Sequence, residues 1–107
     1  MSLERIIKAL VDIGLSKMDA EVYVYIAKKG PKTISHLTKT LIFSKQEINR
    51  SLNTLQANGL LTRNRILFCA LPFEEALVLL IETKKEQAQA MHESKEELLS
   101  NWETKEH

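Results

Sequence analysis

The chain has 107 residues, of which 44% are hydrophobic and 27% are charged. This length allows one domain, or one domain with an appendage, and the balance is ordinary for a soluble globular protein. The single cysteine, Cys69, excludes an internal disulfide framework and a zinc site built on cysteines. There is no apolar stretch long enough for a membrane span and no signal peptide, so we expect a cytoplasmic protein with no membrane partner.

The net charge of +1 conceals an asymmetry along the chain. Residues 1–73 contain eleven Lys and Arg against five Asp and Glu, whereas residues 74–107 contain four Lys against nine Glu. The basic excess is greatest between Lys28 and Arg65, where eight bases stand against the single acid Glu47. A basic body with an acidic tail indicates a polyanionic partner for the body, although a merely dipolar protein has the same composition.

Two helices are predicted in the first thirty residues. Apolar residues at helical spacing predict the first over residues 3–13. Ser16 is a good N-cap for the second helix, Asp19 completes a variant of the capping box, and Gly30-Pro31 ends the helix. The expected buried stripe of the second helix consists of Met18, Val22, Tyr25 and Ile26.

The next two predicted helices are joined by a very short connection. The third helix covers residues 34–41 and begins at the N-cap Thr33. The fourth begins at Ser44, which forms a full S-x-x-E capping box with Glu47. Its expected core-facing residues are Ile48, Leu52 and Leu55.

A β-hairpin and a long helix are predicted to complete the chain. The stretch LLTRNRILFCA predicts a short hairpin that turns near Asn64, because Asn tolerates the left-handed conformation of tight turns. A helix is then expected from about Phe73 to Glu103. The predicted fold class is therefore mainly α with a small β-hairpin, a winged helix-turn-helix in the order α-α-α-α-β-β-α with a long, coiled-coil-like C-terminal helix.

The long helix carries a narrow apolar stripe. Steps of four and three residues, with Lys84 and Lys95 counted in, give the alternation of a and d positions in a coiled coil. Part of the helix can fold back onto the domain, but beyond Lys84 the stripe lies too far out for a small core to cover it. We therefore expect a two-fold homodimer. The expected interface residues are Leu77, Ile81, Ala88, Met91, Leu98 and Trp102.

The sequence shows no catalytic constellation, phosphate-binding loop or metal-ligand spacing, so we expect neither an enzyme nor a cofactor or metal site. Two capped helices and a basic hairpin predict instead a domain that binds double-stranded DNA. The fourth helix would read the major groove, the third would meet phosphates, and the hairpin would touch the minor groove or the backbone. The expected DNA-binding residues are Thr33, Ser35, Lys39, Ser44, Lys45, Gln46, Asn49, Arg50, Asn53, Arg63, Asn64 and Arg65.

The stretch GLSKMDAEVYVYIAKKGPKTISHL, followed by SLNTLQANGLL, resembles the winged-helix domain of the TrmB-like family of archaeal transcriptional regulators. The resemblance covers roughly residues 10–77 and implies a small, dimeric, DNA-binding regulator. Asn49 departs from the family, which often has an aromatic residue there. Ile42 stands where the family often has Gly, so we expect a differently shaped turn. The chain also ends before a large C-terminal ligand domain, so sugar sensing is not implied.

We therefore predict a homodimeric, sequence-specific transcriptional regulator that acts on a pseudo-palindromic operator. Residues 1–71 would form the winged helix-turn-helix DNA-binding domain and residues 72–107 the dimerisation helix. One alternative is a winged-helix module that docks onto a larger transcription assembly. A more distant one is a redox or metabolite sensor that works through Cys69 or through a pocket at the dimer seam. The sequence identifies no small-molecule effector.

Overall fold

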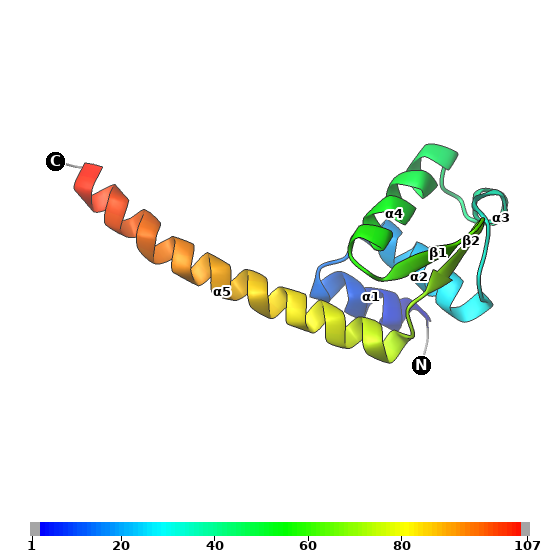
Figure 1. Cartoon of the computed structure of the whole chain (residues 1–107), viewed down its shortest axis with the longest axis horizontal. Helices are drawn as coiled ribbons and strands as arrows, with labels where there is room; N and C mark the ends of the chain where they lie inside the picture. The colour runs from blue at the N-terminus through cyan, green and yellow to red at the C-terminus, as the bar shows by residue number, and fades with distance from the viewer. Residues whose placement is uncertain (1–2, 106–107) are drawn as a thin grey trace.

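The computed structural model describes residues 3–105, which form five helices and one β-hairpin (Figure 1). The chain order confirms the predicted fold class, a mainly helical winged helix-turn-helix with a long C-terminal helix. The elements are α1 (Leu3–Ile13), α2 (Lys17–Lys29), α3 (Ile34–Thr40), α4 (Lys45–Ala57), β1 (Leu61–Asn64), β2 (Leu67–Ala70) and α5 (Phe73–Lys105).

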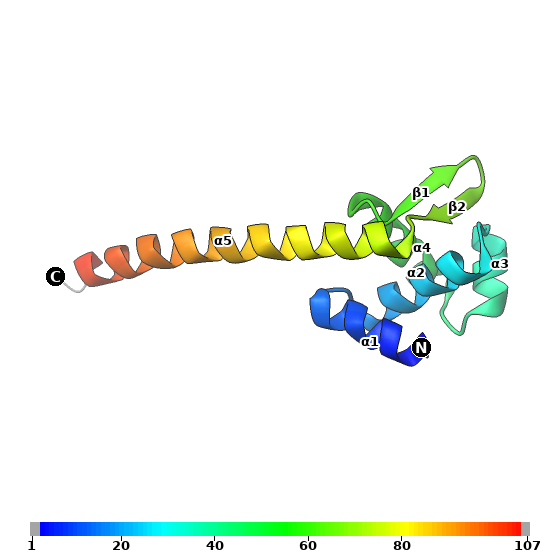
Figure 2. The ribbon, with the colours of Figure 1, turned by 90° about the horizontal axis from the view of Figure 1, so that it is seen from below.

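The molecule is elongated because α5 extends far beyond the rest of the chain. The principal extents are 60 × 30 × 25 Å. The four shorter helices and the hairpin pack together at one end, and the C-terminal half of α5 leads away from them (Figures 1 and 2). Within the packed end, α2 is central because it contacts α1, α4 and β2.

The predicted N-caps are present, but the variant capping box of Ser16 and Asp19 forms only its first half, because the Asp19 carboxylate instead accepts a hydrogen bond from Ser51. The Ser16 hydroxyl accepts a hydrogen bond from the backbone N–H of Asp19 at 3.1 Å. At the start of α4 both halves of the capping box form between Ser44 and Glu47. The turn before α4 is not left-handed at Ile42, since Arg65 is the only non-glycine residue with a positive φ in the described part of the chain. The connection therefore avoids the left-handed conformation that would strain Ile42.

The buried surface of α2 is larger than its predicted stripe. Val22 and Ile26 are buried as expected, whereas Met18 and Tyr25 are only partly buried. Tyr23 was not in the predicted stripe and is completely buried. The physical reason is that α2 packs against α1 on one side and against α4 and β2 on others, so more than one of its faces is covered.

The core is built where the shorter helices meet the hairpin. The predicted inward triad of α4, Ile48, Leu52 and Leu55, is confirmed as buried. The first turns of α5 also belong to the core, since Ala76 and Leu80 are buried. Burial of such side chains supplies most of the stabilisation that holds these elements together.

The hairpin turns one residue later than predicted. Asn64 pairs with Leu67, so Arg65 and Ile66 form a two-residue turn, and the left-handed φ of 60° falls on Arg65 instead of Asn64. Burial explains the pairing register of the two strands, because Leu61 of β1 and Phe68 of β2 both face the core. A slip of one residue in either strand would turn the core-facing side chain of that strand towards solvent.

The β2 strand is also paired with the segment before α3. Phe68 N–H donates to the Lys32 carbonyl at 2.8 Å, and Lys32 N–H donates to the Phe68 carbonyl at 3.1 Å. This antiparallel bridge ties the start of the helix-turn-helix to the hairpin. The two parts of the predicted DNA-binding domain therefore form one packed unit.

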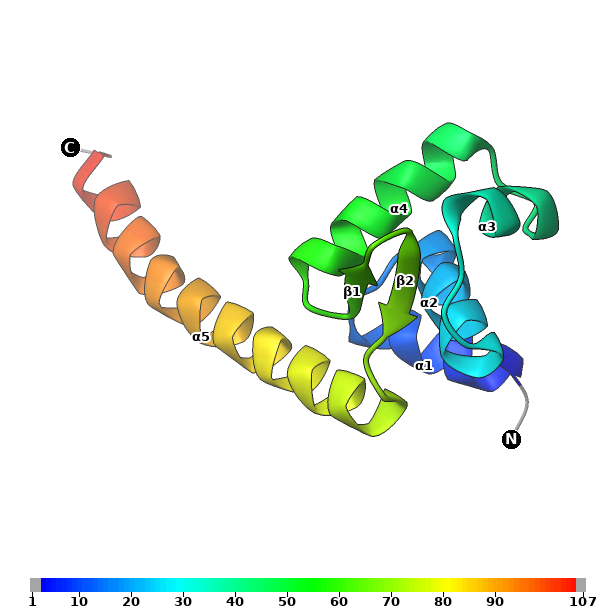
Figure 3. The ribbon, with the colours of Figure 1, turned by 45° about the vertical axis from the view of Figure 1, so that its right-hand side comes forward.

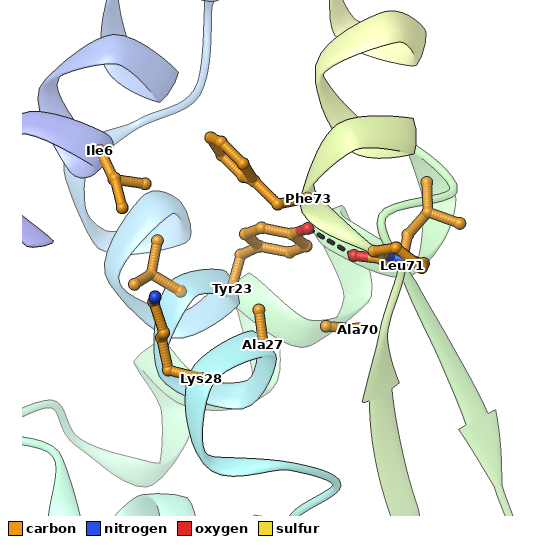
Figure 4. Close-up of a pocket in the computed structure, with 9 residues that line it drawn as sticks. Ile6, Tyr23, Ala27, Lys28, Ala70, Leu71 and Phe73 are labelled. Atoms are coloured by element: carbon orange, nitrogen blue, oxygen red, sulfur yellow. Dashed lines mark hydrogen bonds between the residues drawn. The ribbon is translucent and has the colours of Figure 1, made fainter. Parts of the chain in front are cut away.

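Tyr23 connects the centre of the domain to the start of α5. Its hydroxyl donates a hydrogen bond to the carbonyl of Leu71, directly before Pro72 (Figure 4). The Tyr23 ring also lines a cavity of about 210 Å³ between α1, α2 and the β2–α5 connection, whose other walls include Val24 and Phe73. Burial raises the pKa of Tyr23 from 10.0 to about 12.

This pKa predicts a loss of stability at alkaline pH. The folded state holds the Tyr23 proton more tightly than the unfolded chain, so its contribution is complete below pH 10.0 and is lost as the pH rises through about 12. Urea unfolding followed by circular dichroism should show this loss, and Tyr23→Phe should remove that part of the pH dependence. Tyr25→Phe is the matched control and should retain it. An unchanged alkaline slope in Tyr23→Phe would contradict the assignment.

Candidate nucleic-acid interface

The predicted DNA-binding elements gather at one end of the molecule. The short α3, the N-terminal half of α4 and the hairpin tip lie at the end opposite to the free end of α5 (Figures 1 and 3). The acidic C-terminal part of α5 is therefore far from the basic residues. The exposed bases at this end are Lys39, Lys45, Arg50, Arg63 and Arg65.

The outer face of α4 has the residues that base reading requires. Four of its five predicted contacts are exposed, and Asn49 is partly buried. They recur at positions that share one helix face, opposite to the buried apolar triad. Amide side chains match adenine, and Lys or Arg match guanine, in a major groove about 12 Å wide. The residues on this face are Lys45, Gln46, Asn49, Arg50 and Asn53.

The single acid of this surface is held at the start of α4. A Glu47 carboxylate oxygen accepts the Ser44 backbone N–H at 2.9 Å, and the Ser44 hydroxyl accepts the Glu47 N–H at 3.1 Å. Hydrogen bonds from the backbone and side chain of Ser44 lower the pKa of Glu47. The carboxylate is therefore engaged in capping, and its position beside the positive end of the helix is favourable.

Two of the predicted DNA-binding residues are cap residues. The Ser44 hydroxyl accepts a bond within the α4 cap, and the Thr33 hydroxyl accepts the backbone N–H of His36 at 3.1 Å. In both cases the oxygen acts as the acceptor, so the hydroxyl hydrogen can still be donated to a phosphate. Ser35 and Lys39 on α3 are exposed.

The hairpin tip has an ordered set of contacts. The Arg63 Nε donates to the carbonyl of Arg65 at 2.8 Å. Its guanidinium carbon lies 5.6 Å from the centroid of the Phe68 ring, which is within the range of a cation–π contact. Arg63 is thus drawn back along the hairpin, and the turn residues Arg65 and Ile66 form the tip. Sequence reasoning did not single out Ile66, whose side chain is 66% exposed.

The hairpin lies beside the beginning of α3. A cleft of about 300 Å³ between them is lined by Thr33, Ser35, Arg63, Ile66 and Phe68, together with Ile34. Of the predicted DNA-binding residues, the structure therefore brings Thr33 and Ser35 close to Arg63. Lys39 lies farther away, in the last turn of α3.

A buried hydrogen bond fixes α4 on α2. The Ser51 hydroxyl donates to Asp19 Oδ1 at 2.6 Å, with Ser51 completely buried and Asp19 nearly so. Sequence reasoning assigned Asp19 only to the helix cap and gave Ser51 no role. The sequence could have revealed this bond, because the position of Ser51 beside Leu52 places it on the inward face of α4. A hydroxyl that is buried there requires a hydrogen-bond partner.

The structure also shows where the single cysteine lies, and whether the described residues could form a metal site or a membrane-spanning helix. Cys69 is partly buried in β2, where it pairs with Thr62. Within residues 3–105 no group of three or more His, Cys, Asp and Glu could hold a metal ion. Across the same range, none of the helices combines the length and the apolar character that a membrane crossing requires.

Comparison with known proteins identifies one family. A family model described as "Sugar-specific transcriptional regulator TrmB" matches residues 10–74. A comparison with curated proteins gives no match. The matched segment includes α2, α3, α4 and the hairpin, and it contains every predicted DNA-binding position.

The Ser51–Asp19 bond predicts a measurable loss of stability. Ser51→Ala should lower the free energy of unfolding by about 1–3 kcal/mol, because the Asp19 carboxylate stays buried and loses its donor. Ser94→Ala, at an exposed position on α5, is the matched control and should change stability by less than about 0.5 kcal/mol. Combining Ser51→Ala with Asp19→Ala should cost less than the two single changes together. Strictly additive costs in urea unfolding would rule out the coupling.

Proposed function

The chain belongs to the TrmB family of transcriptional regulators, and we propose that it binds double-stranded DNA as a homodimer at a pseudo-palindromic operator. Residues 1–71 would form the DNA-binding domain, and residues 72–107 would join the two chains. The sugar specificity in the family description is not carried over to this chain, because the match covers residues of the winged helix.

One observation carries the proposal of DNA binding. The outer face of α4 and the hairpin tip expose Lys45, Arg50 and Arg65, while the only acid between Lys28 and Arg65, Glu47, is engaged in the helix cap. A surface of one sign matches the closely spaced phosphates of a duplex. Lys45, Gln46, Arg50 and Asn53 would contact base edges, while the α3 residues and the hairpin would contact the backbone and the minor groove.

Exposure along α5 supports the proposed homodimer. Met91, Leu98 and Trp102 are 72%, 66% and 64% exposed in the single chain. Such a row of large apolar side chains is typical of a surface that another chain covers. Near the start of α5 the apolar stripe is less available to a second chain, because Leu77 is partly buried against its own domain. Lys84 Nζ also donates to the Asp12 carbonyl at 3.0 Å, so the distal part of the stripe supplies the principal support.

A second candidate is a winged-helix module that docks onto a larger transcription assembly. Ile42, in the connection between α3 and α4, is 95% exposed. An apolar side chain at that position suits a protein contact as well as a DNA groove. The measurements on DNA below separate the two candidates.

DNA binding predicts a steep dependence of affinity on salt. The logarithm of the binding constant should fall with that of the salt concentration, by about 0.9 for each phosphate neutralised. On a duplex selected from a random library, Arg50→Ala should cost about 1–3 kcal/mol and relax sequence preference. Lys39→Gln, at a proposed backbone contact of α3, should weaken binding to all sequences. Lys8→Ala removes the same charge from α1 and should have little effect. Fluorescence anisotropy measures each affinity.

Two outcomes of this titration would exclude the mechanism. Duplex affinity that barely changes between low and moderate salt would show that phosphates are not neutralised on binding. Equal, negligible effects of Arg50→Ala and Lys8→Ala would favour the docking module instead.

The dimer proposal predicts that removal of distal α5 gives a monomer. A chain that ends at Lys85 lacks Met91, Leu98 and Trp102 but keeps the turns of α5 that pack on the domain. Multi-angle light scattering should report a dimer for the full chain and a monomer for the shortened one. Glu93→Ala in the full chain, a change at a polar position, should leave the dimer intact. A shortened chain that remains dimeric would move the interface to another surface.

A further inference from the structure

We infer that Arg65 and Ile66 form a preformed probe that enters the DNA minor groove and makes the protein prefer A·T-rich flanks. Arg63 would be the positioning residue that holds this probe in shape. The inference rests on the proposed DNA binding and deepens it, since it adds a specificity that depends on groove shape to the reading of base edges by α4.

The backbone at the tip supplies the first observation. Arg65 has a φ of 60° and is the first residue of a two-residue hairpin turn. Glycine is the favoured residue at such a position, because a side chain makes the left-handed conformation unfavourable. An Arg there gives up stability in the turn, and strain of this kind concentrates at functional sites. The side chain of Arg65 is therefore the feature that the turn presents.

The contacts of Arg63 supply the second observation. Its Nε donates to the Arg65 carbonyl at 2.8 Å, and its guanidinium lies over the Phe68 ring. Phe68 is buried and is also paired with Lys32, so it is a rigid support. The hydrogen bond on the carbonyl of the strained residue holds the turn in its left-handed form. The tip is thus fixed before DNA arrives, and little conformational entropy is lost on binding.

The exposure of Ile66 supplies the third observation. It is 66% exposed at a tip where polar residues and glycine are usual. An apolar side chain beside an Arg is the combination with which proteins enter minor grooves, where the apolar group contacts sugars or a base step. The N-cap residue Thr33 and the α3 residue Ser35 line the same cleft as Ile66. These hydroxyls are placed to meet the phosphates that border the groove.

The physics of the minor groove then sets the preference. A·T tracts have a narrow minor groove with an enhanced negative potential, which attracts an inserted Arg. A G·C flank widens the groove and places the guanine amino group on its floor. The probe therefore favours A·T flanks next to whatever core sequence α4 reads.

The test uses two duplexes with the same selected core, one with A·T tracts and one with G·C sequence in the flanks. The unchanged protein should bind the first about 10-fold more tightly by fluorescence anisotropy. Arg65→Gly, which relieves the strained turn, should reduce this ratio to near one and lower the salt slope by about 0.9. Thr62→Ala, at an exposed position in strand β1 of the same hairpin, is the matched control and should keep the ratio. Circular dichroism verifies that each variant is folded.

Further variants separate the roles of the two neighbours. Ile66→Ser should lower the flank ratio and leave the salt slope unchanged, because no charge is removed. Arg63→Lys keeps the charge but loses the Nε donor, so it should lower the ratio at constant salt slope. In an Arg65→Gly background, Arg63→Lys should have no further effect on the ratio, as expected for a residue that acts through Arg65.

The outcomes distinguish this inference from the proposed function. Loss of affinity for both flanks by the same factor in Arg65→Gly would show that Arg65 rests on the backbone, and it would overturn the minor-groove probe while DNA binding stands. A flank ratio near one in the unchanged protein would overturn it as well. Absence of any salt-dependent duplex binding would instead remove the proposed function itself.

Discussion

The packing of α4 on α2 is the constraint on which the predicted surface depends. Three apolar residues of α4 enter the core, and a buried hydrogen bond joins Ser51 to Asp19. Apolar contacts alone tolerate small rotations of a helix about its axis, whereas a short hydrogen bond between buried groups does not. Because the exposed face of α4 is opposite to this contact, the direction in which Lys45 and Arg50 point is set by residues that never reach the surface.

Local features of the fold were predictable from sequence, and features that depend on tertiary contacts were not. The capping box at Ser44 and the amphipathic pattern of α4 are encoded within a few residues, so both were predicted correctly. The complete burial of Tyr23 depends on the number of elements that pack around α2, which no periodicity reveals. The hairpin turn was misplaced by one residue, because the register follows from which strand residues meet the core.

The same division applies to the candidate surface. The sequence indicated which residue types are present and that Glu47 is the one acid among eight bases. It also predicted that Glu47 is held in a cap, but it did not indicate that Arg63 is drawn onto Phe68 while Arg65 forms the tip. Two arginines of equal charge thus have different geometric roles, which their order along the chain does not show. The proposal of DNA binding combines this geometry with membership of a transcriptional regulator family.

The connection between the hairpin and α5 has a consequence for the spacing of two bound domains. Leu71 is held on both sides, since its carbonyl accepts the Tyr23 hydroxyl and its N–H donates to the Leu60 carbonyl at 2.9 Å. Pro72 directly precedes the first residue of α5, Phe73. Figure 3 shows the short connection from β2 into this helix. The start of the long helix is thus attached to the domain by these two hydrogen bonds and by the buried side chains of Ala76 and Leu80. In the proposed dimer, the distance between the two operator half-sites would depend on how each domain is attached to its α5 helix. An insertion between Leu71 and Phe73 would loosen this attachment and widen the range of half-site spacings that the dimer accepts.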